Sequence, residues 1–204
     1  MQKISNNPAE VAQYLPTQIY WHDFFTAADI DRIIQECQSS ELQSSTVSHN
    51  PNIDNEVRVS NVNFHNRNHQ NSWIFDQINF GIEDMNSKFF HFDLYGYDYF
   101  QYSEYHGDKS GKYNFHMDIF TNEESYASPL TRKLSLVLLL SEPGVDFEGG
   151  EFQMNVGSED KLETLQMKKG TLIAFPSFMI HRVTPVTKGI RRSIVIWVEG
   201  PKFK

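Results

Sequence analysis

The feature that most constrains the fold is a run of short apolar segments, separated by turn residues, that fills the chain from Asp93 onward. The segments are rich in β-branched and aromatic residues, as β-strands are, and glycine or proline stands between them. We expect eight strands: Asp98–His106, Lys112–Phe120, Arg132–Ser141, Glu151–Val156, Leu162–Lys168, Thr171–Pro176, Phe178–Thr184 and Ile190–Glu199. Eight short strands at this spacing predict a double-sheet jelly roll or a small barrel.

Two helices are expected before these strands. Thr26 can cap the first helix, with Asp29 three residues on completing a capping box. The second, from about Asn71 to Phe89, carries an apolar stripe at helical spacing, formed by Ile74, Ile78, Ile82, Met85 and Phe89. Between them we expect the polar segment Ser39–Gln70 to be loop, apart from a short strand at Arg58–Val62. The chain is therefore predicted to be a single domain, 1–204, mainly β with flanking α. Helices of about residues 1–92 would pack on one sheet of a jelly-roll core of about residues 93–201.

Charge argues against a nucleic-acid partner. The chain has 18 basic and 26 acidic residues, a net charge of −8, whereas non-specific nucleic-acid binding is driven by lysine and arginine. Basic residues do gather toward the C-terminus, where a solvated strand edge explains them as well as a binding patch would: Lys168, Lys169, Arg182, Lys188, Arg191 and Arg192.

Cysteine usage and hydropathy point to the cytoplasm. Cys37 is the only cysteine, so no disulfide can form within the chain. No stretch approaches the ~18 apolar residues of a membrane span, and no signal-peptide pattern opens the chain. We therefore expect a cytoplasmic protein, and the sequence does not indicate its oligomeric state.

Three residues on two predicted strands have the chemistry of metal ligands. His116 and Asp118 alternate on one strand and would share a face, with Asn114 and Phe120. His181 lies in an apolar strand 65 residues later. Two histidines and one carboxylate describe a facial triad, the ligand set of non-haem Fe(II) oxygenases. The alternatives are a chance triplet at His116 and a core histidine bonded to a backbone carbonyl at His181.

An arginine must also point into the predicted core. In the strand Ile190–Glu199, alternation places Arg191 and Ser193 on one face and Arg192 with the isoleucines on the other. A buried guanidinium needs an anion, which a dicarboxylate could supply through two hydrogen bonds. A structural pair of Arg191 with Glu151 or Glu199 is the alternative, and Arg192 competes for the same role.

These residues resemble the iron(II)- and 2-oxoglutarate-dependent dioxygenases, and the finer pattern resembles the prolyl 4-hydroxylase-like branch with its PKHD-type hydroxylases. The resemblance covers about residues 95–201. It is carried by Glu104-Tyr105, Tyr113–Asp118, Arg132–Ser135, Asp146–Phe152 and the very specific run Phe175–Ser193. It implies a cupin-like double-stranded β-helix.

The resemblance also implies roles for individual residues. His116, Asp118 and His181 would hold Fe(II) and form the catalytic centre. Arg191, with Ser193 nearby, would bind the distal carboxylate of 2-oxoglutarate, and Tyr105, or else Tyr102, would face this co-substrate. Some relatives place a further co-substrate tyrosine where this chain has Leu139.

The activity implied is hydroxylation of a prolyl or other side chain of a peptide or protein. It would couple O2 and 2-oxoglutarate decarboxylation to succinate and CO2, with ascorbate as a further cofactor that the resemblance allows. The alternatives are the same chemistry on a free amino acid, small metabolite or alkylated base, and a non-catalytic cupin-like metal-binding module. We expect Ser39–Gln70 and Thr121–Thr131 either to select the substrate or to be plain solvated loop.

Overall fold

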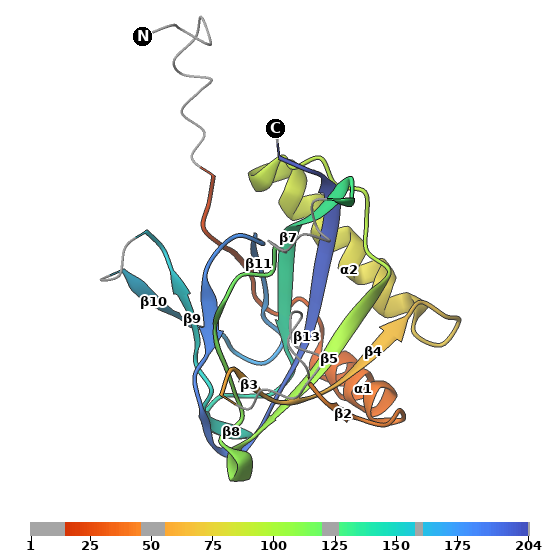
Figure 1. Ribbon diagram of the computed structural model, residues 1–204. Coiled ribbons are helices and arrows are strands. Elements are labelled where there is room, and N and C mark those ends of the chain that lie inside the picture. The colour runs from red at the N-terminus through yellow and green to blue at the C-terminus, as the bar shows by residue number, and fades with distance from the viewer. Residues whose placement is uncertain (1–14, 46–55, 120–126, 158–160, 204) are drawn as a thin grey trace, which may run out of the picture.

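The fold is built on two antiparallel sheets that face each other. The computed structural model describes residues 15–45, 56–119, 127–157 and 161–203. The large sheet has the order β1 (Ile19–Trp21), β11 (Leu172–Pro176), β7 (Leu130–Leu139), β13 (Val186–Pro201), β5 (Tyr99–His106), β4 (Asn61–Asn66) and β2 (Gln43–Ser44), with β8 (Phe147–Gly149) also paired to β13. The small sheet has the order β10 (Leu162–Leu165), β9 (Phe152–Asn155), β12 (His181–Val183), β6 (Lys112–His116) and β3 (Arg58–Val59) (Figure 1).

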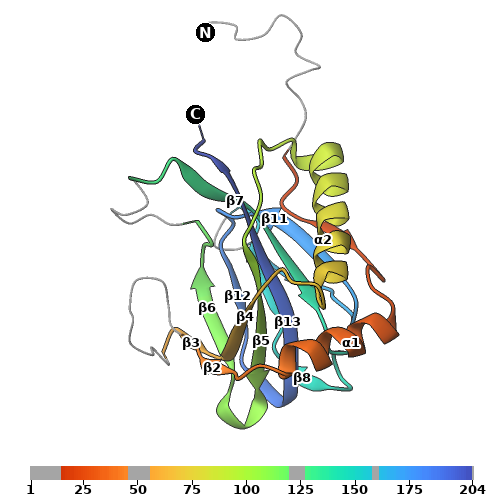
Figure 2. The same ribbon diagram turned by 90° about the vertical axis from the view of Figure 1, so that its right-hand side faces the viewer.

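Both faces of the large sheet are covered. Helices α1 (Ala27–Gln38) and α2 (Ser72–Met85) lie on one side of it, and the small-sheet strands β3 and β6 lie on the other (Figure 2). Leu136, Leu138, Ile194 and Ile196 point to the helices and belong to one apolar core. The intervening residues of β7, Val137 and Leu139, belong to a second core between the sheets. The predicted jelly roll with helices on one sheet is therefore confirmed, and so is the alternation predicted for β13.

Both helices form as predicted, with one shift of register. Thr26 and Asp29 make the reciprocal bonds of a capping box at the start of α1. After α2 the chain continues as a π-helical turn, Asn86–Phe90. The extra residue in this turn buries Phe90 and leaves Phe89 42% exposed, so the predicted apolar stripe is wrong at its last position.

The segment Ser39–Gln70 contains more strand than the sequence predicts. Residues 61–66 form β4, a full strand of the large sheet that pairs with β5. Its buried polar residues explain why the pattern was missed. Asn63 donates to the backbone oxygens of Cys37 and Ser40, and His65 bonds Asn63 and stacks on Phe100.

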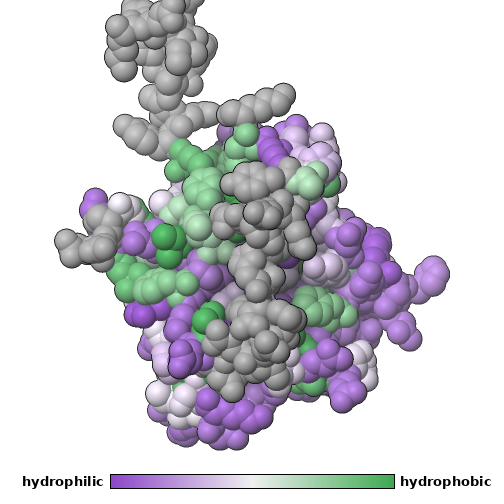
Figure 3. All heavy atoms as spheres, in the orientation of Figure 1, coloured by the Kyte–Doolittle hydropathy of each residue, from purple (hydrophilic) through white to green (hydrophobic). Residues whose placement is uncertain are grey.

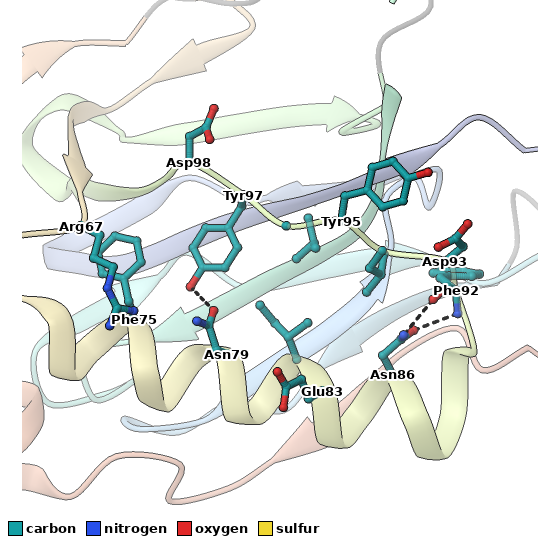
Figure 4. Close-up of a pocket in the computed structure, with 14 residues that line it drawn as sticks. Arg67, Phe75, Asn79, Glu83, Asn86, Phe92, Asp93, Tyr95, Tyr97 and Asp98 are labelled. Atoms are coloured by element: carbon teal, nitrogen blue, oxygen red, sulfur yellow. Dashed lines mark hydrogen bonds between the residues drawn. The ribbon is translucent and has the colours of Figure 1, made fainter. Parts of the chain in front are cut away.

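The segment before β5 crosses α2 and leaves a cavity of about 560 Å³ between them. Figure 4 shows how the segment is held, with the Tyr97 hydroxyl donating to Asn79 at 2.9 Å and Asn86 bonding the backbone of Phe92. This cavity lies on the helix side of the large sheet. Within the described ranges, no helix is both long enough and apolar enough to cross a membrane.

Candidate active site

His116, Asp118 and His181 converge between the two sheets. His116 ends β6, His181 begins β12, and the two histidines stand directly opposite each other in the β6–β12 pairing. His116 Nε2 lies 3.7 Å from Asp118 Oδ1, and His181 Nε2 lies 3.7 Å from Asp118 Oδ2. One potential ligand atom from each residue lies within 4.8 Å of the others. The three side chains can therefore reach one ion.

Asp118 takes its position from a backbone bend and not from the strand. The predicted strand Lys112–Phe120 ends at His116, and Phe120 is outside the described residues. The backbone N–H groups of Asp118 and Ile119 both donate to the Ser177 carbonyl, at 2.9 and 3.2 Å. These bonds hold the bend against the turn before β12. Backbone hydrogen bonds therefore place the Asp118 carboxylate beside His181.

The backbone also orients both imidazoles. His116 Nδ1 lies 2.8 Å from the Asn114 carbonyl, and His181 Nδ1 lies 2.9 Å from the Met179 carbonyl. A carbonyl only accepts, so each Nδ1 carries the hydrogen and each Nε2 keeps its lone pair for the cluster. His181 is thus satisfied by a backbone carbonyl and still offers a ligand atom. Neither carbonyl could be identified from the sequence.

A β-bulge changes which residues share the face of His116. Val183 pairs with Tyr113 while His181 pairs with His116, so β6 holds one residue more than β12 over this stretch. The Tyr113 ring therefore stacks on the His116 ring, with centroids 3.5 Å apart and planes 13° apart. Asn114, expected on that face, is exposed and donates to the Glu56 carbonyl.

The electrostatics of the cluster favour a bound cation. Burial is the main cause, and the neighbouring His181 the second, of a shift that lowers the pKa of His116 to about 3. The His116 ring is therefore neutral near pH 7. Burial alone would raise the pKa of the Asp118 carboxyl, but His181, His116 and Ser135 hold that pKa below its usual range. Asp118 Oδ2 is buried and has no hydrogen-bond partner among the described residues. An ionised oxygen without a partner, beside two imidazole lone pairs, suits a divalent metal.

Arg191 is a buried cation without a described counter-charge. Its side chain is 2% exposed, and its contacts are the Ser193 hydroxyl at 3.3 Å and the Tyr105 ring at 5.6 Å. Burial lowers the pKa of the Arg191 guanidinium. Among the described residues no carboxylate pairs with it, so the expected alternative of a structural Arg–Glu pair is not found. Arg192, on the helix side, is the arginine that pairs with Glu104.

A cavity of about 330 Å³ reaches Arg191 between β8 and β10. Gly150 stands beside the guanidinium stem, because a Cβ there would lie 3.1 Å from Arg191 Cδ. Leu139 also lines this cavity. Of the two candidate tyrosines, Tyr105 lies in the core between the sheets, whereas Tyr102 faces the helices and donates to Glu104.

A second hollow, of about 390 Å³, is lined by aromatic residues and by Asp98, Arg132 and Glu199. Arg132, one of its lining residues, donates to the Asp118 carbonyl at 3.4 Å and lies over the Trp197 ring at 4.2 Å. The buried Trp197 Nε1 has no hydrogen-bond partner in the described part of the chain. The sequence pattern assigns no site role to Arg132, although it lies in a stretch that carries the resemblance, nor to Trp197, which alternates with Arg191 and Ser193.

Apolar side chains are exposed around the strands that carry the cluster. They are Phe115, Met117, Phe178 and Ile180. Over the face seen in Figure 3, hydrophobic residues gather toward the left, while the right-hand side is largely hydrophilic.

The fold and this site define the class of protein. Residues 100–199 match the model of the 2OG-Fe(II) oxygenase superfamily, and the chain belongs to that superfamily. This confirms the resemblance drawn from the motifs.

Its relatives include PKHD-type hydroxylases. That of Colwellia psychrerythraea is 35% identical over 92 residues, which are 44% of this chain and 38% of the relative. That of Idiomarina loihiensis is 34% identical over 101 residues, 50% of this chain and 39% of the relative. The matches therefore span less than two-fifths of the relatives' own length.

Solved prolyl hydroxylases share the fold over nearly the whole chain. The Pseudomonas putida prolyl-4-hydroxylase superposes with a TM-score of 0.70 at 18% identity, over 91% of this chain and 94% of that one. A Trichoplax adhaerens prolyl hydroxylase, solved with a hypoxia inducible factor peptide fragment, gives 0.71 at 16% identity, over 89% and 83%. At these identities the likeness establishes the fold alone.

Proposed function

We propose that the chain is an Fe(II)- and 2-oxoglutarate-dependent hydroxylase that acts on a prolyl or other side chain of a peptide or protein. The observation that carries the proposal is that one core holds two groups of opposite preference. The Asp118 oxygen, which has no described hydrogen-bond partner, lies between two imidazoles and suits a cation, and the buried Arg191 suits an anion. A metal together with a keto diacid supplies both.

His116, Asp118 and His181 would hold the iron, whose bound form supplies O2 activation and the oxidative decarboxylation of 2-oxoglutarate to succinate and CO2. The residues themselves contribute geometry. The Asn114 and Met179 carbonyls fix both imidazoles with Nε2 toward the ion. The apolar rings of Phe152 and Phe175 contact His181 and keep water from that side of the centre.

Arg191 would bind the distal carboxylate of 2-oxoglutarate, with Ser193 and Tyr105 beside it. Bidentate hydrogen bonds to a carboxylate are the interaction that a guanidinium makes best. The cavity of about 330 Å³ at Arg191 offers room for a small dicarboxylate. Leu139 in its wall provides no hydroxyl, so binding would rest mainly on the arginine.

The hollow lined by Arg132 is our candidate for the substrate side chain. The rings of Tyr95, Tyr97, Tyr99 and Trp197 line it together with the acidic residues Asp98 and Glu199, and such rings suit a pyrrolidine ring. These features favour a prolyl peptide over an alkylated base, which would also meet the unfavourable net charge.

Ligand binding under anaerobic conditions tests the proposal. The protein is mixed with Fe(II) and 2-oxoglutarate, and the metal-to-ligand charge-transfer absorbance is recorded for the wild type, His181→Ala and Arg191→Ala. We expect the wild type to show the band, His181→Ala to lose iron, and Arg191→Ala to keep iron with weakened 2-oxoglutarate binding. Equal bands in all three would refute the assignment.

A substrate screen follows. Succinate release is measured with proline-containing peptides, free amino acids and an alkylated base, each with ascorbate present. Release stimulated by a peptide supports the proposed substrate class, and the absence of release with every substrate favours a non-catalytic metal-binding module. Cell fractionation would test the cytoplasmic location, which remains a prediction.

A further inference from the structure

A polar pocket opens at the edge of the sandwich, away from the cavity at Arg191. It lies where β2, β3 and the start of β4 meet the turn after β5, and its volume is about 390 Å³. Its lining residues are Ser44, Ser45, Arg58, Val59, Ser60, Asn61, His106 and Lys109. None of them is acidic, although the chain as a whole carries a net charge of −8. The pocket is thus a local region of positive charge and hydrogen-bond donors.

Arg58 is a second buried cation without a described counter-charge. The residue is 7% exposed, its Nε donates to Ser60 Oγ at 2.9 Å, and its guanidinium lies 4.6 Å from the centre of the Tyr113 ring. No described acidic side chain forms an ion pair with it. Burying a charge without a counter-charge is unfavourable, so an anion in the pocket would stabilise this arrangement.

The serine hydroxyls extend the set of donors. Ser60, which accepts from Arg58, donates its own hydrogen to Ser45 Oγ at 2.9 Å. Ser45 therefore accepts and keeps its hydroxyl hydrogen for another group. The backbone N–H of Ser45 donates to the Ser60 carbonyl at 2.9 Å, which fixes the two hydroxyls side by side. Arg58 and Ser45 thus place donors around one pocket.

Lys109 adds a second positive charge from the turn Gly107–Lys109, and it has no ion-pair partner among the described residues. Glu104 does not line the pocket, although it bonds His106, which does, at 2.9 Å. The Glu104 carboxylate also bonds Tyr102 and Arg192. No acidic side chain of the described residues lines the pocket.

We propose that this pocket is an anion-binding site for a phosphate or carboxylate group, separate from the proposed 2-oxoglutarate site. Arg58 and Lys109 would supply the charge, and Ser45 a neutral donor. The two sites share no lining residue. One ring separates Arg58 from the metal cluster, because Arg58 lies over Tyr113 and Tyr113 stacks on His116. The site does not depend on iron or on the proposed function.

Binding of inorganic phosphate to the metal-free protein tests the site. Calorimetric titration is run at constant ionic strength, balanced with sodium chloride, on the wild type, Arg58→Gln and Lys109→Gln. We expect saturable binding to the wild type. Affinity should fall at least about tenfold in Arg58→Gln and about threefold in Lys109→Gln, since hydrogen bonds to charged groups are the strong ones. Lys109 lies on an exposed turn, so this variant remains informative if Arg58→Gln fails to fold.

Lys161→Gln is the matched control, because it removes the same charge from an exposed residue that does not line the pocket. Unchanged affinity in Lys161→Gln supports the site. Equal weakening in Lys161→Gln and Lys109→Gln, or binding that does not saturate, shows an adventitious ion only and overturns it. Phenyl phosphate and benzoate then distinguish a phosphate source from a carboxylate source. The charge-transfer band with Fe(II) and 2-oxoglutarate should persist in Lys109→Gln, which keeps this test separate from that of the proposed function.

Discussion

Replacing Arg191 with methionine should strongly weaken 2-oxoglutarate binding without destabilising the metal-free protein. The guanidinium is buried, and its partners among the described residues are the Ser193 hydroxyl at 3.3 Å and the Tyr105 ring at 5.6 Å. Losing a hydrogen bond to a charged group costs about 1.5–3 kcal/mol, and 3.3 Å is long for such a bond. The cation–π contact adds about 0.5–2 kcal/mol.

The desolvation of the buried ion works in the opposite direction. Its penalty is several kcal/mol, and replacing buried charged groups with apolar residues of similar volume is often neutral or stabilising by about 1–4 kcal/mol. We therefore expect the free energy of unfolding of Arg191→Met to equal or exceed that of the wild type. Affinity for 2-oxoglutarate should fall at least about 30-fold, since removing one partner of a buried charge pair costs about 2–5 kcal/mol.

The assay combines urea unfolding of the metal-free protein with anaerobic 2-oxoglutarate titration of the Fe(II) form. Arg192→Met is the matched control, because Arg192 is the next residue of the same strand and pairs with Glu104 at 3.1 Å on the helix side. This control should lower stability and leave 2-oxoglutarate affinity unchanged. A loss of more than about 3 kcal/mol in Arg191→Met, together with wild-type co-substrate affinity, would show that Arg191 is structural.

Three further predictions concern packing, pH and reactivity. Gly150 (φ +64°) and Gly144 (φ +77°) both have left-handed backbones, but a Cβ at Gly150 would lie 2.8 Å from Val186 whereas one at Gly144 would meet nothing within 4 Å. Thermal melts should therefore show that Gly150→Ala lowers the free energy of unfolding by about 1–3 kcal/mol more than Gly144→Ala does. An equal loss in the two variants would contradict the argument from crowding at Gly150. Burial opposes ionisation of Glu104, but hydrogen bonds from Tyr102, Gln38 and Arg192 lower its pKa below the value of 4.5 typical of the unfolded chain. The ionised carboxylate therefore stabilises the fold fully above pH 4.5, and this contribution is lost as the pH falls through the folded pKa. The stability deficit of Glu104→Gln, measured by urea unfolding, should thus shrink as the pH drops below about 4.5, and a constant deficit would count against this ionised network. Burial raises the pKa of the Cys37 thiol, so a thiol reagent at pH 8 should label the native protein at least about 100-fold more slowly than the urea-unfolded chain, and rapid native labelling would show that α1 opens readily.

Much of the fold could be predicted because its signals are local. Thr26 and Asp29 lie within one helical turn, so their capping box is legible in the sequence. The alternation along β13 correctly separates Arg191 from Arg192, because two adjacent residues of a strand must face opposite ways. The strand β4 was missed because its buried Asn63 and His65 are satisfied by partners elsewhere in the chain.

For the candidate site, the sequence indicates which residue types could bind a metal but not the contacts that hold them in place. The spacing of His116 and Asp118 suggested one continuous strand, whereas a bulge and a bend place them. A bulge depends on how two strands pair, so the residue pattern of a single strand does not predict where one occurs. Trp197 and the pocket at Arg58 also require the tertiary structure, since their neighbours come from distant elements.

The bend at Asp118 is tied to Ser177 by peptide groups alone, and every residue type except proline offers such an N–H. The side chain at position 119 can therefore change in evolution while the carboxylate stays beside His181, whereas the buried Ser177 hydroxyl also bonds Ser135. Proline at position 119 is the exception, because it removes one of the two donors without touching any metal ligand. Relatives can consequently keep this geometry while sharing few identical residues around the bend.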